Sequence, residues 1–283
     1  MSERRQIERR LRTFTEVAEI MAALKNAAMV EAARLRRYVP AQQRVVRTVE
    51  AATHDFLTHY PQPLPAPATA GEFFLVVGSE RGFCGSYNEE LAVALERERA
   101  RPDAATAPVV VVGRRLALRL SRQIRLAAAF EAPSVADEVQ PTITRLITEM
   151  QRLPAARAAL LPLIITVLHH EIVGRSSEVR VSKPFRAFAG DGRRFSDPPR
   201  LYLQPLEFFR ELTDHYLFAV LHELFYSALL AENERRLQHL EGALRRLDRK
   251  CGELALRVNA LRQEEITEEI EVILLSTGMS EEV

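Results

Sequence analysis

Hydrophobic residues in the last third of the chain follow a heptad spacing that continues far beyond the length of an ordinary helix. The apolar positions recur at alternating intervals of three and four residues, with Asn233 in the same register. They are Leu230, Leu237, Leu240, Leu244, Leu247, Cys251, Leu254, Val258 and Leu261. This spacing is the a/d repeat of a coiled coil. Because no proline occurs between Leu206 and Ser276, the pattern predicts one helix on the order of 100 Å long whose seam faces a partner.

The N-terminal part of the chain, up to about Tyr60, also has the hydrophobic period of a helix. Its early apolar positions are Ile7, Leu11, Phe14, Val17, Met21 and Leu24, and alanines dominate the stretch that follows. Alanine favours helix and lets a second helix approach closely. Pro40 is expected to end or kink this helix. The alternating prolines of Pro61–Pro67 predict a stiff linker without helix.

The region between the two helical segments alternates between strand and helix patterns. Continuous apolar runs predict buried parallel strands at Phe73–Val77, Val109–Val112 and Leu163–Leu168. Helical patterns follow at Asn88–Arg99, Arg114–Arg122 and Val135–Arg152. Glu178–Phe188 alternates as an exposed antiparallel strand would, and Leu201–Leu203 suggests one further strand. Strand–helix–strand alternation predicts a small α/β domain with right-handed crossovers.

These elements together predict an α/β insert between two long terminal helices. The fold class is an antiparallel coiled coil combined with a small Rossmann-like α/β domain. The expected divisions are an N-terminal coiled-coil helix (1–60), a proline-rich linker (61–71), the α/β domain (72–204) and a long C-terminal coiled-coil helix (205–283). The N-terminal helix is the shorter one, so part of the C-terminal helix is expected to extend beyond it, bare or inside another protein.

Composition narrows the classes of function. A formal net charge of +1 argues against a dedicated nucleic-acid binder. The longest apolar runs are too short to cross a bilayer, so we expect no direct membrane insertion. The charged, helical start does not resemble a signal peptide. The two cysteines, Cys84 and Cys251, are expected to be free thiols in a reducing compartment.

Two local patterns invite a chemical interpretation, and each has a simpler one. Gly82 and Gly85 follow a predicted strand, as in a phosphate-binding loop, but neither nucleotide fingerprint is present. A tight strand-to-helix turn in which glycine supplies positive φ is therefore favoured. His169-His170-Glu171 could bind a metal, but neighbouring residues of a strand point to opposite faces, so a strand-end turn is favoured. We expect no catalytic residue, no cofactor and no metal.

Four sequence features resemble one known family. Gly78-Ser79-Glu80-Arg81-Gly82-Phe83-Cys84-Gly85-Ser86-Tyr87-Asn88 is similar to its S-D-R-G-L-C-G-x-x-N motif. Arg262-Gln263-Glu264-Glu265-Ile266-Thr267-Glu268-Glu269-Ile270 is similar to its R-Q-x-x-I-T-x-E-L motif. Leu201-Tyr202-Leu203-Gln204-Pro205 matches its turn into the last helix, and Glu232 and Arg236 match S-E-x-x-x-R. The order helix, α/β insert, longer helix covers the whole chain. The sequence thus resembles the gamma subunit of F-type ATP synthases, as a divergent member with Glu80 in place of aspartate.

This resemblance implies a role and a set of contacts. The chain would be a non-catalytic central-stalk rotor that couples ion-driven rotation of a membrane ring of c subunits to ATP synthesis or hydrolysis in an alpha/beta hexamer. An epsilon-type small subunit would bind at its base, and the complex would lie on the cytoplasmic side of a bacterial inner membrane. The implied beta-subunit contact comprises Arg262, Gln263, Ile266, Thr267 and Glu269. The implied rotor-domain turn comprises Arg81, Gly82, Cys84 and Gly85.

The residues themselves leave two other classes open. One is a coiled-coil adaptor whose α/β domain binds a protein partner, and its seam would form a homodimer. The other is an enzyme built on the α/β domain, which would need polar groups converging at the carboxyl ends of its strands. After Val77 and Val112 the chain offers Ser79, Glu80 and Arg81, and then Arg114 and Arg115, which is a thin set for catalysis.

Overall fold

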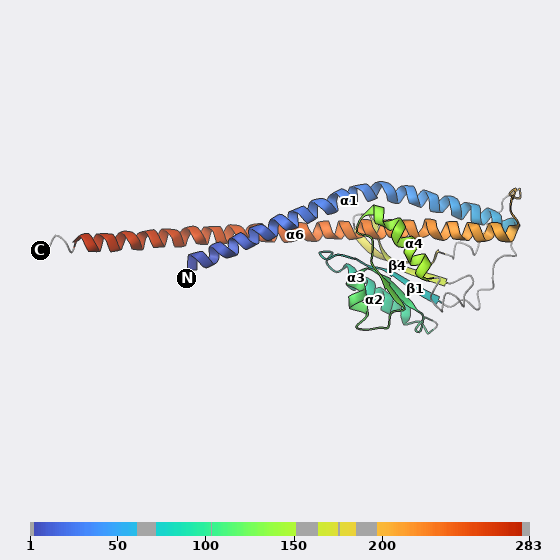
Figure 1. The fold of residues 1–283 in the computed structure, drawn as a ribbon, viewed down its shortest axis with the longest axis horizontal. Helices are drawn as coiled ribbons and strands as arrows, with labels where there is room; N and C mark the ends of the chain where they lie inside the picture. Colours follow the sequence, from blue (N-terminus) through green and yellow to red (C-terminus); the bar gives the residue numbers. More distant parts are fainter. Residues whose placement is uncertain are drawn as a thin grey trace. The chain divides into compact units, whose positions relative to one another are not determined.

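Two long helices flank an α/β region in the computed structural model, which describes residues 3–60, 72–102, 104–150, 164–174, 176–184 and 197–278. Helix α1 spans Glu3–His59 and helix α6 spans Pro205–Gly278 (Figure 1). The chain divides into two compact units. The larger consists of Ala28–Arg236, and the smaller of Met1–Ala27 together with Leu237–Val283.

A mixed sheet of five strands forms the centre of the larger unit. Its strands are β1 (Glu72–Val77), β2 (Val109–Val112), β3 (Ala128–Phe130), β4 (Ile164–Val173) and β5 (Ser176–Ser182), in the order β3-β2-β1-β4-β5. The first four strands are parallel, and β5 pairs antiparallel with β4. The carboxyl ends of β1, β2, β3 and β4 therefore lie at one edge of the sheet.

Within the described residues, the parallel strands are connected by the helices α2 (Tyr87–Arg99), α3 (Arg114–Leu120) and α4 (Val139–Met150). The last is preceded by the 3₁₀ turn η2 (Ala136–Glu138). From β1 to β3 the chain moves across the sheet in one direction, and from β3 to β4 it moves back. Right-handed crossovers therefore place α2 and α3 on one face and α4 on the other. Figure 1 shows α2 and α3 together on one side of the strands.

Strand periodicity explains how both faces of the sheet are filled. Phe74 and Val76 pack with Leu91 and Leu95 of α2 in one buried cluster. Their neighbours along β1 are also buried and point to the opposite face, because successive side chains alternate. All four valines of β2 are buried. Such continuous apolar strands are typical of parallel sheets covered on both faces.

Within the larger unit, residues 28–59 of α1 run antiparallel to residues 205–236 of α6. The ring of Phe56 lies 5.0 Å from that of Phe208. Further along the pair, Gln42 donates a hydrogen bond to the carbonyl of Ala219 at 3.1 Å, and Arg36 pairs with Glu234. The contacts proceed in opposite directions along the two helices.

The smaller unit contains a second antiparallel stretch of the same two helices. Three ion pairs record its register: Lys25 with Glu241 at 3.0 Å, Arg4 with Glu265 at 2.7 Å, and Glu3 with Arg257 at 2.6 Å. The predicted fold class, an α/β insert between two long helices that pair antiparallel, is confirmed.

Several local predictions were wrong. Pro40 does not end the first helix, since α1 continues through it as one element; the alternative expectation, a kink at Pro40, stays a prediction. Leu201–Leu203 forms no strand, and β3 was not anticipated. The proline-rich linker 61–71 and the last five residues lie outside the part of the chain that the structure describes.

Candidate functional site

The turn that joins β1 to α2 is built by polar side chains of its own sequence. Ser79 donates its backbone N–H to Asn88 Oδ1 at 3.0 Å, and Asn88 Nδ2 donates to Ser79 Oγ at 2.8 Å. Ser79 is fully buried. This reciprocal pair joins the end of the strand to the first turn of the helix.

Positive φ in this turn occurs at Gly85, as glycine suggests, and at Phe83. Gly82 is not among the residues with positive φ. Another glycine, Gly113 after β2, is required by both its close surroundings and its positive φ. A Cβ on Gly113 would come within 2.6 Å of the Gly78 carbonyl oxygen, and its φ is +115°. The loops after β1 and β2 therefore pass each other too closely for a side chain.

One face of α6 presents a buried ion pair to this turn. Arg236 and Glu232, one helical turn apart, form the pair and are 8% and 4% exposed. Arg236 also donates to the Gly82 carbonyl oxygen and to Cys84 Sγ, each at 3.3 Å. The backbone of Arg81 donates to the Glu232 carboxylate. We call Glu232, Arg236, Cys84 and the backbone of Arg81 and Gly82 the junction cluster.

The thiol of Cys84 is inert in this setting. It is 5% exposed and donates to the carbonyl oxygens of Arg81 and Gly82. Burial, reinforced by the carboxylate of Glu232, raises the pKa of Cys84 to about 12. Because the thiolate is the reactive form, Cys84 acts here as a packing group and hydrogen-bond donor.

Arg235, the residue immediately before Arg236 in α6, binds other parts of the α/β domain. It donates to Glu90 of α2 at 2.6 Å and to the Ser177 carbonyl oxygen of β5 at 2.9 Å. Two turns of α6 earlier, the hydroxyl of Tyr87 donates to the Ala228 carbonyl oxygen at 3.1 Å. Side chains and backbone of α6 thus bond to the turn, to α2 and to β5.

His169 and His170 lie inside β4, and the predicted strand-end turn at this position is wrong. His170 is buried and stacks on Tyr87, with ring centroids 4.0 Å apart. Its Nε2 lies 2.9 Å from the Tyr87 carbonyl oxygen and its Nδ1 lies 3.0 Å from Ser177 Oγ. Among the residues described, no group of three or more His, Cys, Asp or Glu side chains is placed to hold a metal.

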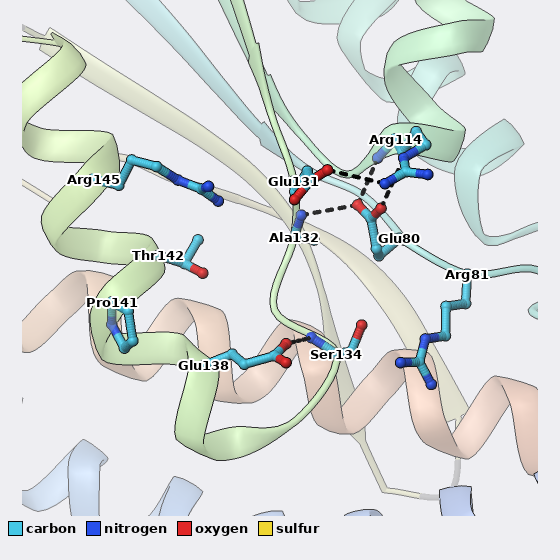
Figure 2. A pocket seen from close by; sticks show the side chains of 10 residues that line it. All are labelled: Glu80, Arg81, Arg114, Glu131, Ala132, Ser134, Glu138, Pro141, Thr142 and Arg145. Carbon is cyan, nitrogen blue, oxygen red and sulfur yellow. Dashed lines mark hydrogen bonds and ion pairs between the residues drawn. The ribbon is translucent and has the colours of Figure 1, made fainter.

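A pocket of about 610 Å³ opens at the carboxyl ends of β1, β2 and β3. Figure 2 shows its lining side chains, with Glu80 and Arg114 on one side and Thr142 and Arg145 of α4 on the other. Glu80 Oε2 accepts the backbone N–H groups of Arg114 and Ala132, each at 3.0 Å. Its other oxygen lies 3.2 Å from the Arg114 guanidinium.

Glu80 thereby occupies the position in which this kind of fold binds phosphate. Ligands of open α/β sheets bind beyond the carboxyl ends of the strands, and backbone N–H groups at a helix N-terminus bind their phosphates. Here the N–H at the start of α3 already has a carboxylate acceptor from the same chain. This arrangement disfavours a nucleotide phosphate at α3.

The five residues of the implied beta-subunit contact lie on α6 in the smaller unit. All five are exposed. At about 100° per residue, they spread over nearly half of the helix circumference, beginning at the edge of the seam that ends at Leu261. Two of these five residues bond to each other, since the Thr267 hydroxyl donates to the Gln263 carbonyl oxygen at 2.9 Å. The apolar residues near this end of the helix are also open to solvent, at 46% to 66% exposed, namely Ile266, Ile270, Val272, Ile273 and Leu274.

The seam residues differ in how far they are covered. Leu230 and Leu240 are buried, whereas Leu237, Leu244, Leu247, Cys251, Leu254, Val258 and Leu261 are partly buried. Most of the residues between them from Gln238 onward are more exposed. The side of α6 that carries the seam is thus the covered side within each unit.

Sequence reasoning located the turn and the exposed segment but missed what surrounds them. Glu232 and Arg236 were noticed as a motif without a role, and the acceptor role of Glu80 was not foreseen. One signal was available for the first pair, because an acid and an arginine four residues apart share a helix face. Their burial depends on contacts with a turn about 150 residues earlier in the chain, and sequence spacing does not reveal such contacts.

The fold and these sites define a protein with an α/β domain inserted between two long paired helices, one of which carries an exposed apolar end. Among the helices that the structure describes, none combines the length and apolar character needed to cross a membrane.

Comparison with known proteins identifies the family. A family model described as "ATP synthase" matches residues 3–277. The ATP synthase gamma chain of Caldanaerobacter subterraneus subsp. tengcongensis is 24% identical over 303 residues, which covers 98% of this chain and 99% of that protein. The chain belongs to the gamma-subunit family of ATP synthases.

Solved structures share the fold. A chain of the Euglena gracilis mitochondrial ATP synthase rotor (rotational state 1) has a TM-score of 0.59 at 16% identity, covering 93% of this chain and 98% of that one. A chain of the OSCP/F1/c-ring structure of the same enzyme (rotational state 3) has a TM-score of 0.59 at 19% identity, with coverages of 99% and 96%. A Tetrahymena thermophila mitochondrial central stalk/c-ring chain has a TM-score of 0.52 at 16% identity, with coverages of 79% and 99%.

Proposed function

We propose that this chain is the central-stalk rotor subunit of an F-type ATP synthase and is not itself a catalyst. It would couple ion-driven rotation of a membrane ring to ATP synthesis or hydrolysis in an alpha/beta hexamer. Family membership and the match to rotor chains along nearly the whole length support this proposal.

The observation that carries the proposal is the exposed end of α6. Side chains that would normally be buried, such as Ile270 and Leu274, lie on the surface of α6 in the turns that follow Arg262 and Gln263. A run of exposed apolar residues indicates an interaction surface. A sleeve of alpha and beta subunits around this end would cover it.

The proposed mechanism follows from an asymmetric shaft inside a ring of catalytic sites. As the shaft turns, its contacts favour a different nucleotide-affinity state in each beta subunit, which is a population shift produced by differential contacts. Arg262 has a planar guanidinium suited to bidentate pairing with a carboxylate. Exposed ion pairs contribute only about 0–1 kcal/mol, so such contacts can form and break during rotation.

The remaining proposed partners are an epsilon-type small subunit and the ring of c subunits, with the assembly on the cytoplasmic side of a bacterial inner membrane. The protein chains in the structures with similar folds come from a rotor and from OSCP/F1/c-ring and central stalk/c-ring assemblies, which supports this setting. The turn containing Arg81, Gly82, Cys84 and Gly85 is proposed to lie on the rotor's own domain.

Reconstitution tests this function. The chain is mixed with alpha and beta subunits from the same organism, and sustained ATP hydrolysis is measured for wild type and for Arg262→Ala with Gln263→Ala. We expect a complex with one copy of this chain, and at least a threefold lower rate in the double variant because the exposed contact is lost.

A matched control is available in the α/β domain. Arg122 and Gln123 are also an adjacent, exposed arginine–glutamine pair, so Arg122→Ala with Gln123→Ala should leave the rate within about 1.5-fold of wild type, as expected for surface substitutions. Equal losses in both double variants would argue against a specific contact. Failure of the wild-type chain to assemble would overturn the rotor assignment.

A further inference from the structure

The junction cluster is an unusual choice for joining a helix to a domain. A buried ion pair loses so much hydration that well-packed apolar side chains of similar volume often give equal or greater stability. Glu232 and Arg236 are nevertheless almost fully buried where α6 meets the turn after β1. Unlike an apolar contact, the pair makes directional hydrogen bonds to particular atoms, and these bonds fix the position of α6 against the turn.

The bonds that the cluster makes to the α/β domain end on one short segment. Glu232 accepts the N–H of Arg81, and Arg236 donates to the Gly82 carbonyl oxygen and to Cys84 Sγ. An apolar surface could slide along this turn with little change in energy. A guanidinium fork bound to a carbonyl and a carboxylate cannot, since its geometry is fixed.

A second set of hydrogen bonds to the α/β domain starts from a neighbouring face of the same helix. Arg235 is about 100° around α6 from Arg236, and it holds Glu90 and the carbonyl of Ser177. Bonds that leave the helix in two directions oppose its rotation about its own axis relative to the α/β domain. By contrast, the Arg34–Asp137 pair between α1 and the domain is exposed.

We infer that the junction cluster transmits torque between the α/β domain and α6. This inference rests on the proposed rotor function and adds to it the point through which the turning force passes. Glu232 and Arg236 are positioning residues, since they act on the attachment of the domain and contact no nucleotide.

Cys84 provides a direct readout of the cluster. It is one of two cysteines in the chain, so replacing Cys251 with alanine leaves it as the single thiol. Its side chain is buried against Arg236. Loosening of the cluster exposes the thiol to a reagent such as 5,5′-dithiobis(2-nitrobenzoate), whose reaction is followed by absorbance on the full-length chain.

The test uses Glu232→Met with Arg236→Met in the Cys251→Ala background, so that volume is roughly kept and directional bonds are lost. The synthase containing the variant is reconstituted in vesicles, and the ratio of ions pumped to ATP hydrolysed is measured. We expect the ratio to fall at least fivefold and Cys84 to react at least tenfold faster. A ratio within twofold of wild type in the assembled variant overturns the inference.

A matched control breaks an ion pair that does not touch α6. Arg119 and Glu89 are exposed and lie 2.9 Å apart between α3 and α2. Arg119→Gln with Glu89→Gln should leave both the ratio and the thiol reaction within twofold of wild type. A fivefold fall in this control as well would mean that the ratio responds to any disturbance of the domain, and the inference would be rejected.

If the melting curve shows that the methionine variant does not fold, or if that variant does not assemble, Arg236→Lys tests the inference in its place. Lysine keeps the charge facing Glu232 but lacks the fork that also reaches Gly82 and Cys84. We expect at least a twofold lower ratio with assembly intact, and an unchanged ratio overturns the inference. Failure of the wild-type chain to assemble would instead count against the proposed function, and the thiol reaction on the isolated chain would remain interpretable.

Discussion

At the scale of single residues, the most consequential side chains are polar groups in places where water is excluded. His169 is 3% exposed within β4, and among the described residues its Nδ1 has no hydrogen-bond partner. Burial, with smaller contributions from the charges of His170 and Arg180, lowers the pKa of His169 to about 3. The folded protein therefore holds this imidazole neutral.

This burial predicts a loss of stability in mild acid. Between the unfolded pKa of about 6.5 and a pH of about 3, the imidazole of His169 binds a proton in the unfolded chain and stays neutral in the folded chain. Within that window, each unit by which the pH falls lowers the free energy of unfolding by about 1.4 kcal/mol. Measured by urea denaturation between pH 7 and pH 5, His169→Leu should show a visibly shallower fall than wild type.

The exposed His215 supplies the control for this measurement. His215→Leu should retain the wild-type slope, because folding does not withdraw the exposed side chain of His215 from water. Parallel curves for wild type and His169→Leu would show that His169 is protonated in the folded protein, contrary to this account.

At the scale of elements, the ends of β1, β2 and β3 are held together by one carboxylate. Glu80 follows β1, Arg114 begins α3 after β2, and Ala132 follows β3. Glu80 accepts the backbone N–H groups of both other residues (Figure 2). It is therefore an internal anion ligand at the edge of the sheet.

Removing this ligand should create a site for a small anion. Glu80→Ala leaves two backbone donors without their acceptor, and hydrogen bonds to charged groups contribute about 1.5–3 kcal/mol. We expect a loss of that order in chemical denaturation, and partial recovery when formate is added, because formate can occupy the vacated position.

Glu131→Ala serves as the comparison, since Glu131 is exposed and its carboxylate pairs with Arg114 at 2.9 Å. Its loss should be less than about 1 kcal/mol, and formate should not restore it. If formate stabilises both variants and wild type equally, the anion acts on the whole protein and the site does not exist.

The elements differ in how well the sequence predicts them, for physical reasons. Phe73–Val77 and Val109–Val112 were predicted as parallel strands because burial on both faces requires continuous apolar runs. Strand β3 was missed because it is three residues long, begins with two alanines, and owes its form to pairing with β2. Leu201–Leu203 is a short apolar run of the kind found in strands, but it pairs with none of the described strands.

The candidate sites also differ in how well the sequence predicts them. The exposure of Arg262 and Gln263 follows from their place outside the heptad register, which the sequence displays. The junction cluster depends on bringing Glu232 and Arg236 to Gly82 and Cys84, which only the folded chain does. The helix pattern gave no reason to expect that these two charges are buried.

At the scale of the whole molecule, the account makes the chain a shaft that turns. Two observations support it: the chain's membership of the ATP synthase gamma-subunit family, and the exposed apolar end of α6. The junction cluster adds a mechanical link between α6 and the α/β domain within the larger unit. Torque can pass along the chain only if α6 is held both by the α/β domain and, at its exposed end, by a partner.

Direct observation of rotation tests the central claim. Val93 of α2 is 46% exposed and Cys84 is 5% exposed. Val93→Cys, in a chain with Cys251 replaced by alanine and Cys84 kept, can therefore carry a gold nanorod. The complex with alpha and beta subunits is fixed to a surface through the hexamer and given ATP. The account predicts rotation of the rod in one direction that stops when ATP is removed, whereas an assembled complex that hydrolyses ATP while the rod stays still would contradict it.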